Sequence, residues 1–459
     1  MRPSIHRGIN SLARLPVLFL TGAVIVVAPA PAKGAAGPGL AEPDGAEPVL
    51  LSEDSSWCWF QDERAIIDGG RLLFTGVTGN GEITLTVYDF DTVDRRTIVH
   101  NADSFRPDDH NAAALLVRPD GRYLCVYAGH NNERKIRYRL SVEPGNPYDW
   151  HPEQLFDVHE LVTYSNVYQL AGPGLTYNFF RGRANGYPYL PHYMISADDG
   201  KTWEYGGMLF AHEDGIPYVR YASDGRETIH FTTTQGHPRF DDNDIFHAFI
   251  RDGAFFTSDG TRIGPLSTEP KSDYGPGDFT RVFEATGDDT AWTSDIQLDD
   301  RGHPYIGFTV TRDPVRGDEN PDAGGFDHRY HYARWDGEMW HEQEIAYAGT
   351  RLYPAEQYYT GLIALHPRDP DVVYISADVD PDTNVPLITD GERRYEIFRG
   401  DRRADTDEWQ WTPVTENSRQ DNLRPIVTSD GRRTVVLWLY GRYTSYIDYD
   451  MQVWGLIDP

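Results

Sequence analysis

Four side chains between residues 110 and 181 have the types needed to move protons beside a carboxylate: His110, His130, Tyr164 and Arg181. Histidine and tyrosine can each remove or supply a proton at a reacting centre. An arginine can neutralise a carboxylate, so that the neighbouring carbon–hydrogen bond becomes more acidic. It would also adjust the pKa values of the tyrosine and the histidines. Such a set suits the elimination of a glycosidic bond next to a uronic acid.

These residues are far apart along the chain, and a repeated pattern of turn and strand provides an architecture that can bring them together. In each copy a polar turn leads into a short apolar strand. The seven copies begin at Asp68, Asp120, Gly172, Asp224, Asp300, Asp369 and Asp430. Repeats spaced by roughly 50 to 75 residues are typical of propeller blades. We therefore predict an all-β fold, a seven-bladed β-propeller of four-stranded antiparallel blades.

Two further segments fit this prediction. Ser196–Trp203 matches an Asp-box turn, S-x-D-x-G-x-T-W, in which the aspartate and threonine bond turn amides, so Asp198 is assigned a structural role. At the C-terminal end, Ile447–Trp454 leaves the last blade one strand short. Val49–Leu51 is expected to supply the missing strand and close the ring, which removes free sheet edges.

The direction of the strands places the chemistry at one mouth of the propeller channel. Innermost strands all run the same way, so their starts meet at one mouth, and the antiparallel second strands end there. The residues at these positions in the second to fourth copies are His110, His130, Tyr164, Arg181, Tyr218 or Arg220, and His237. Alone, His110 could bond an adjacent carboxylate, Tyr164 could pack at the rim, and Arg181 could pair with a surface acid. Their convergence favours catalysis over these structural roles.

Several segments also resemble the BNR-4 repeat family, over nearly the whole chain from about residue 50. They are Asp108–Ala113, Thr163–Leu170, Tyr177–Arg181, Pro217–Gly225, Asp421–Pro425 and Leu437–Tyr443. That family includes seven-bladed secreted polysaccharide lyases, notably ulvan lyases and lyases for rhamnosyl-glucuronate caps of plant gums. The resemblance implies a histidine–tyrosine acid–base pair and an arginine that neutralises the uronate. These roles carry over to His110, Tyr164 and Arg181.

Substrate contacts are expected from four more residues. The resemblance implies that His130 is a second active-site histidine and that Tyr221 contacts the substrate. Arg220 and His237 are added because of their place at the mouth. The interval between His130 and Tyr164 is short against the family pattern, so Tyr168 is kept as the alternative base.

Composition limits the partners and the location of the chain. With 42 Lys and Arg against 71 Asp and Glu, the formal net charge is -29 at pH 7. Such a surface argues against nucleic acid or an anionic membrane as partner, while a local basic pit can still bind an anionic polysaccharide. Residues 1–32 have the basic start, apolar core and small residues of a signal peptide. We predict a linker over 33–48, a single catalytic propeller over 49–459, and a secreted, extracellular or periplasmic, monomer.

Neither a cofactor nor a disulfide is required by this interpretation. Cys58 and Cys125 fall on predicted strands and fit a disulfide or two buried thiols equally well. Asp378–Asn384 has acidic spacing like that of a calcium loop, but it lacks glycine at the sixth position and glutamate at the twelfth. A structural Ca²⁺ or another divalent metal is left open.

Three functions remain open on the sequence alone. The first is a polysaccharide lyase that cleaves a rhamnosyl-glucuronate-type linkage by β-elimination. The second is a rhamnosidase-like or sialidase-like glycoside hydrolase, which needs two carboxylates at the scissile bond; Asp295 and Asp378 are available. The third is a non-catalytic carbohydrate-binding propeller, in which Trp57, Trp59 and Trp292 on the rim would stack on sugars.

Overall fold

The computed structural model describes residues 47–458, apart from 63, 185–186, 213–214, 316, 318–322 and 355. All of them belong to the second of two compact units, Gly37–Pro459. The predicted signal peptide, 1–32, and most of the predicted linker, 33–48, lie outside the described residues and stay predictions. No helix among the described residues is long and apolar enough to cross a membrane.

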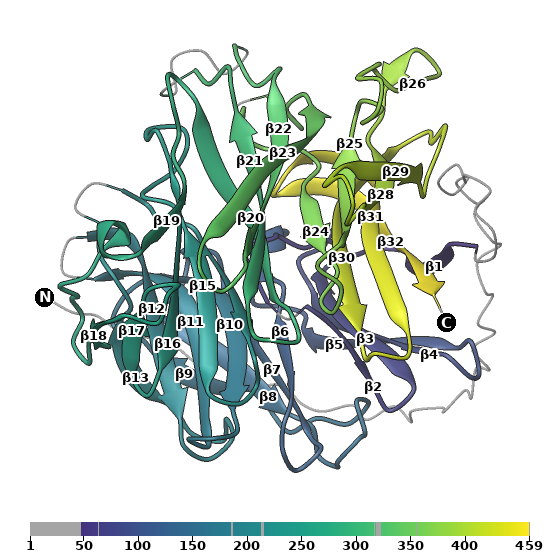
Figure 1. Cartoon of the computed structure of the whole chain (residues 1–459). Helices are drawn as coiled ribbons and strands as arrows, with labels where there is room; N and C mark the ends of the chain where they lie inside the picture. The colour runs from purple at the N-terminus through teal and green to yellow at the C-terminus, as the bar shows by residue number, and fades with distance from the viewer. Residues whose placement is uncertain are drawn as a thin grey trace, which may run out of the picture. The chain divides into compact units, whose positions relative to one another are not determined.

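Seven antiparallel sheets, here blades A to G, follow one another along the chain (Figure 1). Blade A consists of β2 (Ala65–Asp68), β3 (Arg71–Val77), β4 (Ile83–Asp89) and β5 (Arg95–Asn101). Blade B consists of β6 (Ala114–Val117), β7 (Tyr123–Tyr127), β8 (Lys135–Leu140) and β9 (Gln154–Asp157). Blade C consists of β10 (Val162–Leu170), β11 (Leu175–Ala184), β12 (Tyr187–Ser196) and β13 (Glu204–Met208).

Blade D is enlarged to six strands: β14 (Val219–Ser223), β15 (Thr228–Thr233), β16 (Ile245–Arg251), β17 (Ala254–Phe256), β18 (Arg262–Pro265) and β19 (Thr280–Phe283). Blade E consists of β20 (Thr290–Leu298), β21 (Pro304–Thr311), β22 (His328–Trp335) and β23 (Trp340–Gly349). Blade F consists of β24 (Ile363–Leu365), β25 (Val372–Ala377), β28 (Glu396–Arg402) and β29 (Trp409–Pro413), with a small hairpin of β26 (Ile388–Thr389) and β27 (Glu392–Arg393) inserted. Blade G consists of β30 (Asp421–Ser429), β31 (Thr434–Ser445), β32 (Asp448–Asp458) and β1 (Val49–Ser52).

The blades form a closed ring, which confirms the predicted fold class. The innermost strands contact one another in the order β2, β6, β10, β14, β20, β24 and β30, and β30 returns to β2. Short 3-10 helices at Asp109–Asn111 and Pro276–Asp278 are the helical elements of the described part of the chain. All seven predicted turns join a first strand to a second one.

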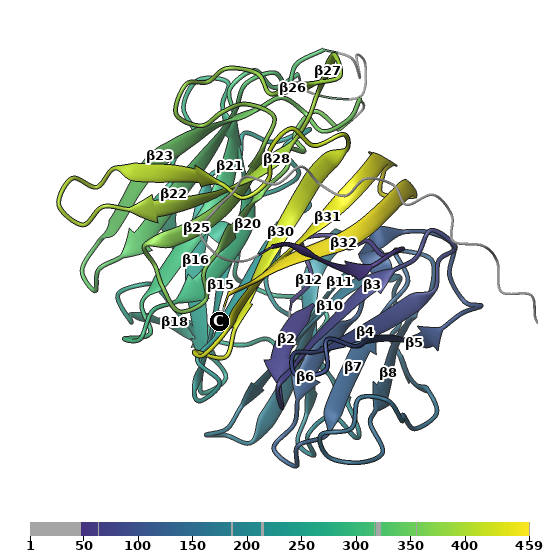
Figure 2. The ribbon, with the colours of Figure 1, turned by 90° about the vertical axis from the view of Figure 1, so that its right-hand side faces the viewer.

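Blade G closes the ring with a strand from the other end of the chain, as predicted. β1 pairs antiparallel with β32, with Val49 opposite Gly455 and Leu50 opposite Trp454. Figure 2 shows β1 running along β32 beside the strands of blade A. The outermost strand of the last blade is thus supplied before the first blade begins, and it covers the edge of β32.

The predicted Asp-box turn between β12 and β13 is also confirmed. Asp198 Oδ1 accepts from the backbone amides of Lys201 and Thr202 at 3.1 and 2.8 Å, and its Oδ2 accepts from the Thr202 hydroxyl at 2.7 Å. Trp203 is buried. The aspartate is therefore fully engaged in holding the turn.

The centre of the ring is filled by Trp57–Asp62, which we call the plug. The apolar pattern before the turn at Asp68 predicts one innermost strand over Trp57–Ile67, and this prediction is wrong over its first half, because only Ala65–Asp68 is a strand. The plug instead contacts the inner edges of six blades. Its aromatic rings supply three of these contacts: Phe60 lies 4.5 Å from Tyr218, and Trp59 lies 5.6 Å from Trp292 and 4.5 Å from Tyr359, between ring centroids.

Polar groups of the plug make the remaining contacts. The Gln61 amide donates to the carbonyl oxygen of His110 at 2.8 Å in blade B. The Asp62 backbone amide donates to Asn166 Oδ1 at 2.7 Å in blade C. Trp57 accepts at its carbonyl from Arg424 of blade G at 2.7 Å. The plug therefore turns a channel into a pit that is closed at its floor.

The two cysteines are buried free thiols and form no disulfide. Cys58 belongs to the plug and Cys125 lies in β7. The sequence fits a disulfide or two buried thiols equally well, and the structure has two thiols.

Removing one plug ring should cost much of the stability of the propeller. Phe60 is 1% exposed and contacts rings from three blades. We expect Phe60→Ala to lower the free energy of unfolding by roughly 3 to 5 kcal/mol, measured by urea denaturation, because a large cavity opens where seven strands meet. Val93→Ala, at a side chain that is 63% exposed, is the control and should change it by less than about 0.5 kcal/mol. A loss below about 1 kcal/mol for Phe60→Ala would show that the plug does not stabilise the ring.

Candidate active site

The site lies at the mouth where first strands begin and second strands end. His110 is in the 3-10 helix just before β6, and His130 follows β7. Tyr164 is near the start of β10, and Arg181 is near the end of β11. Adjacent blades B and C therefore bring these four side chains together, as the strand directions predicted.

Asp108 joins the two histidines. It caps the 3-10 helix by accepting from the backbone amide of His110 at 3.1 Å. Its Oδ1 lies 2.8 Å from Nδ1 of His110, and its Oδ2 lies 2.9 Å from Nδ1 of His130. The two imidazole rings stack with centroids 3.9 Å apart. Burial opposes the charge of Asp108, but the histidines outweigh it and hold the pKa of this carboxyl below its ordinary value.

The stacked histidines differ in protonation. Burial and the charge of His110 lower the pKa of His130 to about 4. Burial also acts against a charge on His110. The negative charges that Cys58 and Asp108 can carry nevertheless raise the pKa of this ring well above its ordinary value. At neutral pH His110 is therefore an imidazolium, and His130 is neutral, since two charged rings in contact would repel.

The neutral state fixes the hydrogen positions of His130. An ionised carboxylate only accepts, so Nδ1 of His130 donates to Asp108 and Nε2 keeps its lone pair. Nε2 lies 3.5 Å from Nη2 of Arg181. His130 thus presents a basic nitrogen beside the guanidinium.

Tyr164 is placed by a bulge in β10. The pairing register with β11 shifts between Thr163 and Asn166, and Tyr164 has φ +69°, in the left-handed region that non-glycine residues rarely adopt. Its hydroxyl is buried and has no hydrogen-bond partner among the described residues. Burial raises the pKa of Tyr164 well above its ordinary value, although Arg181 and His110 act against this rise. The side chain is therefore a neutral phenol whose proton is free to be given.

Arg181 is enclosed by aromatic rings. Its guanidinium carbon lies 4.8 Å from the centroid of Tyr164, 5.3 Å from Tyr189 and 5.4 Å from Tyr218. No carboxylate of the described residues forms a salt bridge with it, although most other buried arginines of the chain have one. A guanidinium held by ring faces and neutral partners, without a carboxylate, is suited to bind the carboxylate of a ligand.

A second buried arginine holds the histidine loop from below. Arg424, at φ +52° in β30, pairs with Asp109 Oδ2 at 2.5 Å and donates to the Tyr443 hydroxyl at 2.7 Å. Asp109 Oδ1 lies 2.9 Å from Nδ1 of His110. Sequence reasoning missed Arg424 as a positioning residue. Its only signal was membership of the Asp421–Pro425 segment that resembles the family.

The groups that could hold a metal lie in this same site. Two sets of ligand atoms fall within 4.8 Å of one another among the described residues: Cys58, Asp109 and His110, and Asp108, His110 and His130. Thiolate, imidazole and carboxylate together suit a divalent transition ion. In the acidic loop of blade F, Asp378 pairs with Arg393 at 3.0 Å and Asp380 bonds its own turn at Thr383. The expectation that no cofactor is required stays a prediction.

Other residues predicted from the sequence lie away from the four. Arg220 pairs with Asp62 at 2.6 Å and Asp295 at 3.2 Å, at the floor side of the plug. Tyr221 packs on Phe179 with centroids 4.4 Å apart, in the core between blades C and D. For these two residues the proposed substrate contacts have no support in the geometry.

His237 and Tyr168 have contrasting surroundings. His237 faces the site through Tyr218, whose ring lies 5.5 Å away, and burial lowers its pKa to about 3. Tyr168 lies in the core, where its hydroxyl donates to the carbonyl oxygen of Tyr221 at 2.9 Å. Of the two tyrosines kept as base, Tyr164 is therefore the one that reaches the mouth.

The tryptophans expected to stack on sugars are buried. Trp57, Trp59 and Trp292 are 1%, 4% and 2% exposed. They belong to the plug and its surroundings, so the expectation that they form an exposed rim platform is wrong. Their apolar rings are buried and fill the centre of the propeller.

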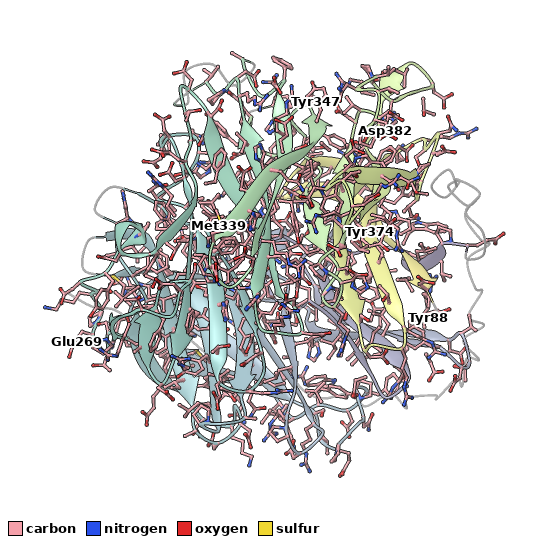
Figure 3. The ribbon with its side chains drawn as sticks, in the orientation of Figure 1. Tyr88, Glu269, Met339, Tyr347, Tyr374 and Asp382 are labelled. Atoms are coloured by element: carbon pink, nitrogen blue, oxygen red, sulfur yellow. The ribbon has the colours of Figure 1, made fainter. Side chains whose placement is uncertain are left out.

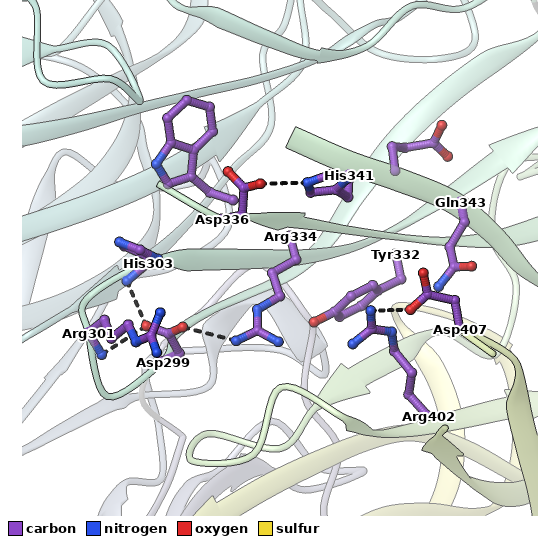
Figure 4. A pocket seen from close by; sticks show the side chains of 12 residues that line it. Asp299, Arg301, His303, Tyr332, Arg334, Asp336, His341, Gln343, Arg402 and Asp407 are labelled. Carbon is purple, nitrogen blue, oxygen red and sulfur yellow. Dashed lines mark hydrogen bonds and ion pairs between the residues drawn. The ribbon is translucent and has the colours of Figure 1, made fainter. Parts of the chain in front are cut away.

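A separate pocket of about 430 Å³ lies between blades E and F, at the end of the strands away from the mouth (Figure 4). Two of its three arginines are paired: Arg334 with Asp299 at 3.2 Å, and Arg402 with Asp371 at 2.8 Å. His341 pairs with Asp336 at 2.7 Å. This balance of charge contrasts with the unpaired guanidinium at the mouth.

Comparisons with known proteins agree on the fold. An ulvan lyase of family PL25 bound to -[GlcA(1-4)Rha3S]- has a TM-score of 0.61 and 13% identity, covering 89% of this chain and 95% of that one. The polysaccharide lyase Uly1 has a TM-score of 0.54 and 11% identity, covering 87% and 90%. A GH93 α-L-arabinofuranosidase of Fusarium graminearum follows at 0.43 and 11%, covering 76% and 92%. At these identities the likeness to the two lyases shows a shared fold alone.

At the level of sequence, the comparison with curated proteins gives no match. A family model described as "BNR repeat-containing family member" does match, over residues 66–348, which is more than half of the chain and runs from blade A to blade E. Both histidines, the tyrosine and the arginine of the site fall inside this match. The chain belongs to the BNR repeat-containing family.

Proposed function

We propose that this protein is a secreted polysaccharide lyase that cleaves a rhamnosyl-glucuronate-type linkage, as in ulvan or a related uronic-acid polysaccharide, by β-elimination. The product would have a 4,5-unsaturated uronate at its new end. One observation supports this most strongly: the half-buried guanidinium of Arg181 has no carboxylate partner among the described residues and lies beside a neutral histidine and the ring of Tyr164, whose hydroxyl has no hydrogen-bond partner there.

The first task of the site is to bind the uronate carboxylate at Arg181. The guanidinium offers a fork of donors that matches the two carboxylate oxygens. Pairing there withdraws charge from the carboxylate and makes the hydrogen on C5 more acidic. The binding is strengthened because the guanidinium lies among rings instead of in water.

The second task is the proton transfer. In the proposed step Nε2 of His130 takes the proton from C5, the electron pair forms the C4–C5 double bond, and the C4–O4 bond breaks. The Tyr164 hydroxyl gives its proton to the departing O4. The imidazolium of His110, whose ring lies 5.6 Å from that of Tyr164, stabilises the resulting phenolate. Proton return from His130 to Tyr164 through water restores the starting state.

This assignment differs from the one based on the sequence, where His110 shared the acid–base work and His130 bound substrate. The geometry favours the exchange because the pKa of His130 is lowered and that of His110 is raised. A base must be unprotonated to act, whereas a charge stabiliser must be protonated. Both histidines keep roles in the reaction.

The hydrolase alternative has less support. Asp295, one of the two carboxylates proposed for it, accepts from the Leu365 amide at 2.8 Å and pairs with Arg220 below the plug. Asp378 is buried against Thr350 and Arg393 in blade F. Neither faces the four residues of the mouth. The fold shared with two polysaccharide lyases further supports elimination.

Loss of the unpaired guanidinium should abolish turnover. We expect Arg181→Ala to lower kcat/KM on ulvan by roughly 10²- to 10³-fold or more, since the loss of one oriented donor in an active site typically has this effect. The assay follows ultraviolet absorbance of the unsaturated uronate together with reducing ends. Arg95→Ala, at an ion pair of the outer strand β5, is the control and should match the wild type. Reducing ends without absorbance would point to hydrolysis and contradict the proposal.

Activity should persist over a wide range of pH. His130 must be neutral, and its pKa is lowered to about 4, so kcat/KM should rise as pH increases through about 4 instead of the ordinary value near 6.5. His110 must be protonated, and its pKa is raised, so activity should be lost only well above pH 6.5. The measurement is the pH profile of kcat/KM on ulvan.

Asp108→Asn tests the cause of this profile. Without the carboxylate, His110 loses a partner that favours its charge, and the alkaline limb should move to lower pH. An unchanged alkaline limb in this variant would mean that His110 does not set it.

A further inference from the structure

We propose that Phe240 is a sugar-stacking residue of a distal subsite, and that the polysaccharide extends from Arg181 along blade D to this ring. The inference rests on the proposed function and adds a second point of contact to it. It concerns a neutral sugar unit of the chain, bound several units away from the one whose linkage is cleaved.

The exposure of Phe240 is unusual for its type. Its side chain is 57% exposed, and Phe326 is 52% exposed. Arg351 covers one face of Phe326, with its guanidinium carbon 5.0 Å from the ring centroid. Phe240 is on the mouth side, because it follows β15, a second strand, whose end lies there. Single exposed apolar side chains are common on protein surfaces; what distinguishes Phe240 is its place on the mouth side, beside the site.

A continuous row of rings joins Arg181 to Phe240. The guanidinium lies 5.4 Å from the Tyr218 centroid. Tyr218 lies 5.5 Å from His237, and His237 lies 6.0 Å from Phe240, between centroids. Each of these steps is comparable to the length of one pyranose ring. Tyr218 and His237 are buried, so the row fixes the place of Phe240 relative to Arg181, and the sugar chain would pass over it.

The turn that presents Phe240 is rigid. Its backbone amide donates to the His237 carbonyl oxygen at 2.9 Å, and the Arg239 amide donates to Nδ1 of His237 at 3.0 Å. Arg239 accepts at its carbonyl from Gly317 at 2.9 Å and pairs with Glu356 at 2.6 Å, which ties the turn to the loops of blades E and F. A ring held in place before binding loses little conformational freedom when a ligand stacks on it.

The ring itself selects the kind of sugar, because the charged residues beside it already have partners. Arg239 is two positions after His237 and precedes Phe240, and Asp241 and Asp242 follow it. An apolar ring face suits a neutral sugar with few hydroxyls on one side, such as a 6-deoxyhexose. The distal subsite is therefore selective for the neutral unit of an alternating polysaccharide, whereas Arg181 selects the acidic one.

The test compares Phe240→Ala with Met339→Ala. Met339 is 56% exposed and lies in the turn between β22 and β23, at the end of the strands away from the mouth (Figure 3). On long ulvan chains, Phe240→Ala should raise KM about tenfold, equivalent to 1.4 kcal/mol, with kcat unchanged. On the shortest oligosaccharide that is still cleaved, it should change neither constant. Phe240→Tyr should restore the wild-type KM, and Met339→Ala should match the wild type on both substrates.

Three results would overturn the inference: an unchanged KM on the polymer for Phe240→Ala, an equal loss on the short oligosaccharide, or an equal loss for Met339→Ala. Retained melting temperature shows that each variant is folded. If no cleavage occurs at all, binding separates the two proposals. Retardation in gels that contain ulvan, reduced by Phe240→Ala alone, would support the subsite while the lyase activity fails.

Discussion

The filling of the central channel is the constraint on which the rest of this structure depends. Seven innermost strands around one axis leave a hole, and a hole lined by strand edges is costly unless side chains occupy it. The plug Trp57–Asp62 occupies it with aromatic rings that reach blades D, E and F. Because the plug also bonds the carbonyl oxygen of His110, the same segment that closes the channel sets the height of the histidine loop. The plug therefore both packs the core and positions the site.

Another feature of the innermost strands is strained backbone. Tyr164, Leu362 and Arg424, on or next to three innermost strands, have φ values of +69°, +84° and +52°. Such conformations cost of order 1 to 3 kcal/mol each and persist only where the surroundings determine them. Near Tyr164 the strain accompanies a bulge, which lets a side chain leave the alternation of its strand. The closed ring provides the stability that offsets this cost.

Sequence reasoning was most successful where the pattern is local. The seven turns and the Asp box follow from short-range signals, and the β1–β32 closure follows from the strand that the last repeat lacks. Strand direction then placed His110, His130, Tyr164 and Arg181 at one mouth. It failed where the backbone departs from the regular alternation of side chains along a strand. In a regular strand Tyr164 and Tyr168 would share a face, but the bulge between Thr163 and Asn166 sends Tyr168 into the core. The pattern predicts a strand over the plug because its apolar residues suit either a buried strand or the filling of the channel. Only the closed ring as a whole decides between these two roles.

The electrostatics of the site give the strongest argument for an acidic ligand. The chain has 71 acidic residues against 42 basic ones, and yet no carboxylate of the described residues forms a salt bridge with Arg181. Burying a lone charge is costly, and rings of Tyr164, Tyr189 and Tyr218 return only part of that cost. A bound carboxylate would recover the remainder, whereas a neutral sugar would not. The site therefore prefers a uronate to a neutral sugar for two reasons: the contacts that the carboxylate makes, and the high free energy of Arg181 when no ligand is bound. The surrounding negative surface strengthens this selectivity, because it disfavours any polyanion that cannot place its charge on that one guanidinium.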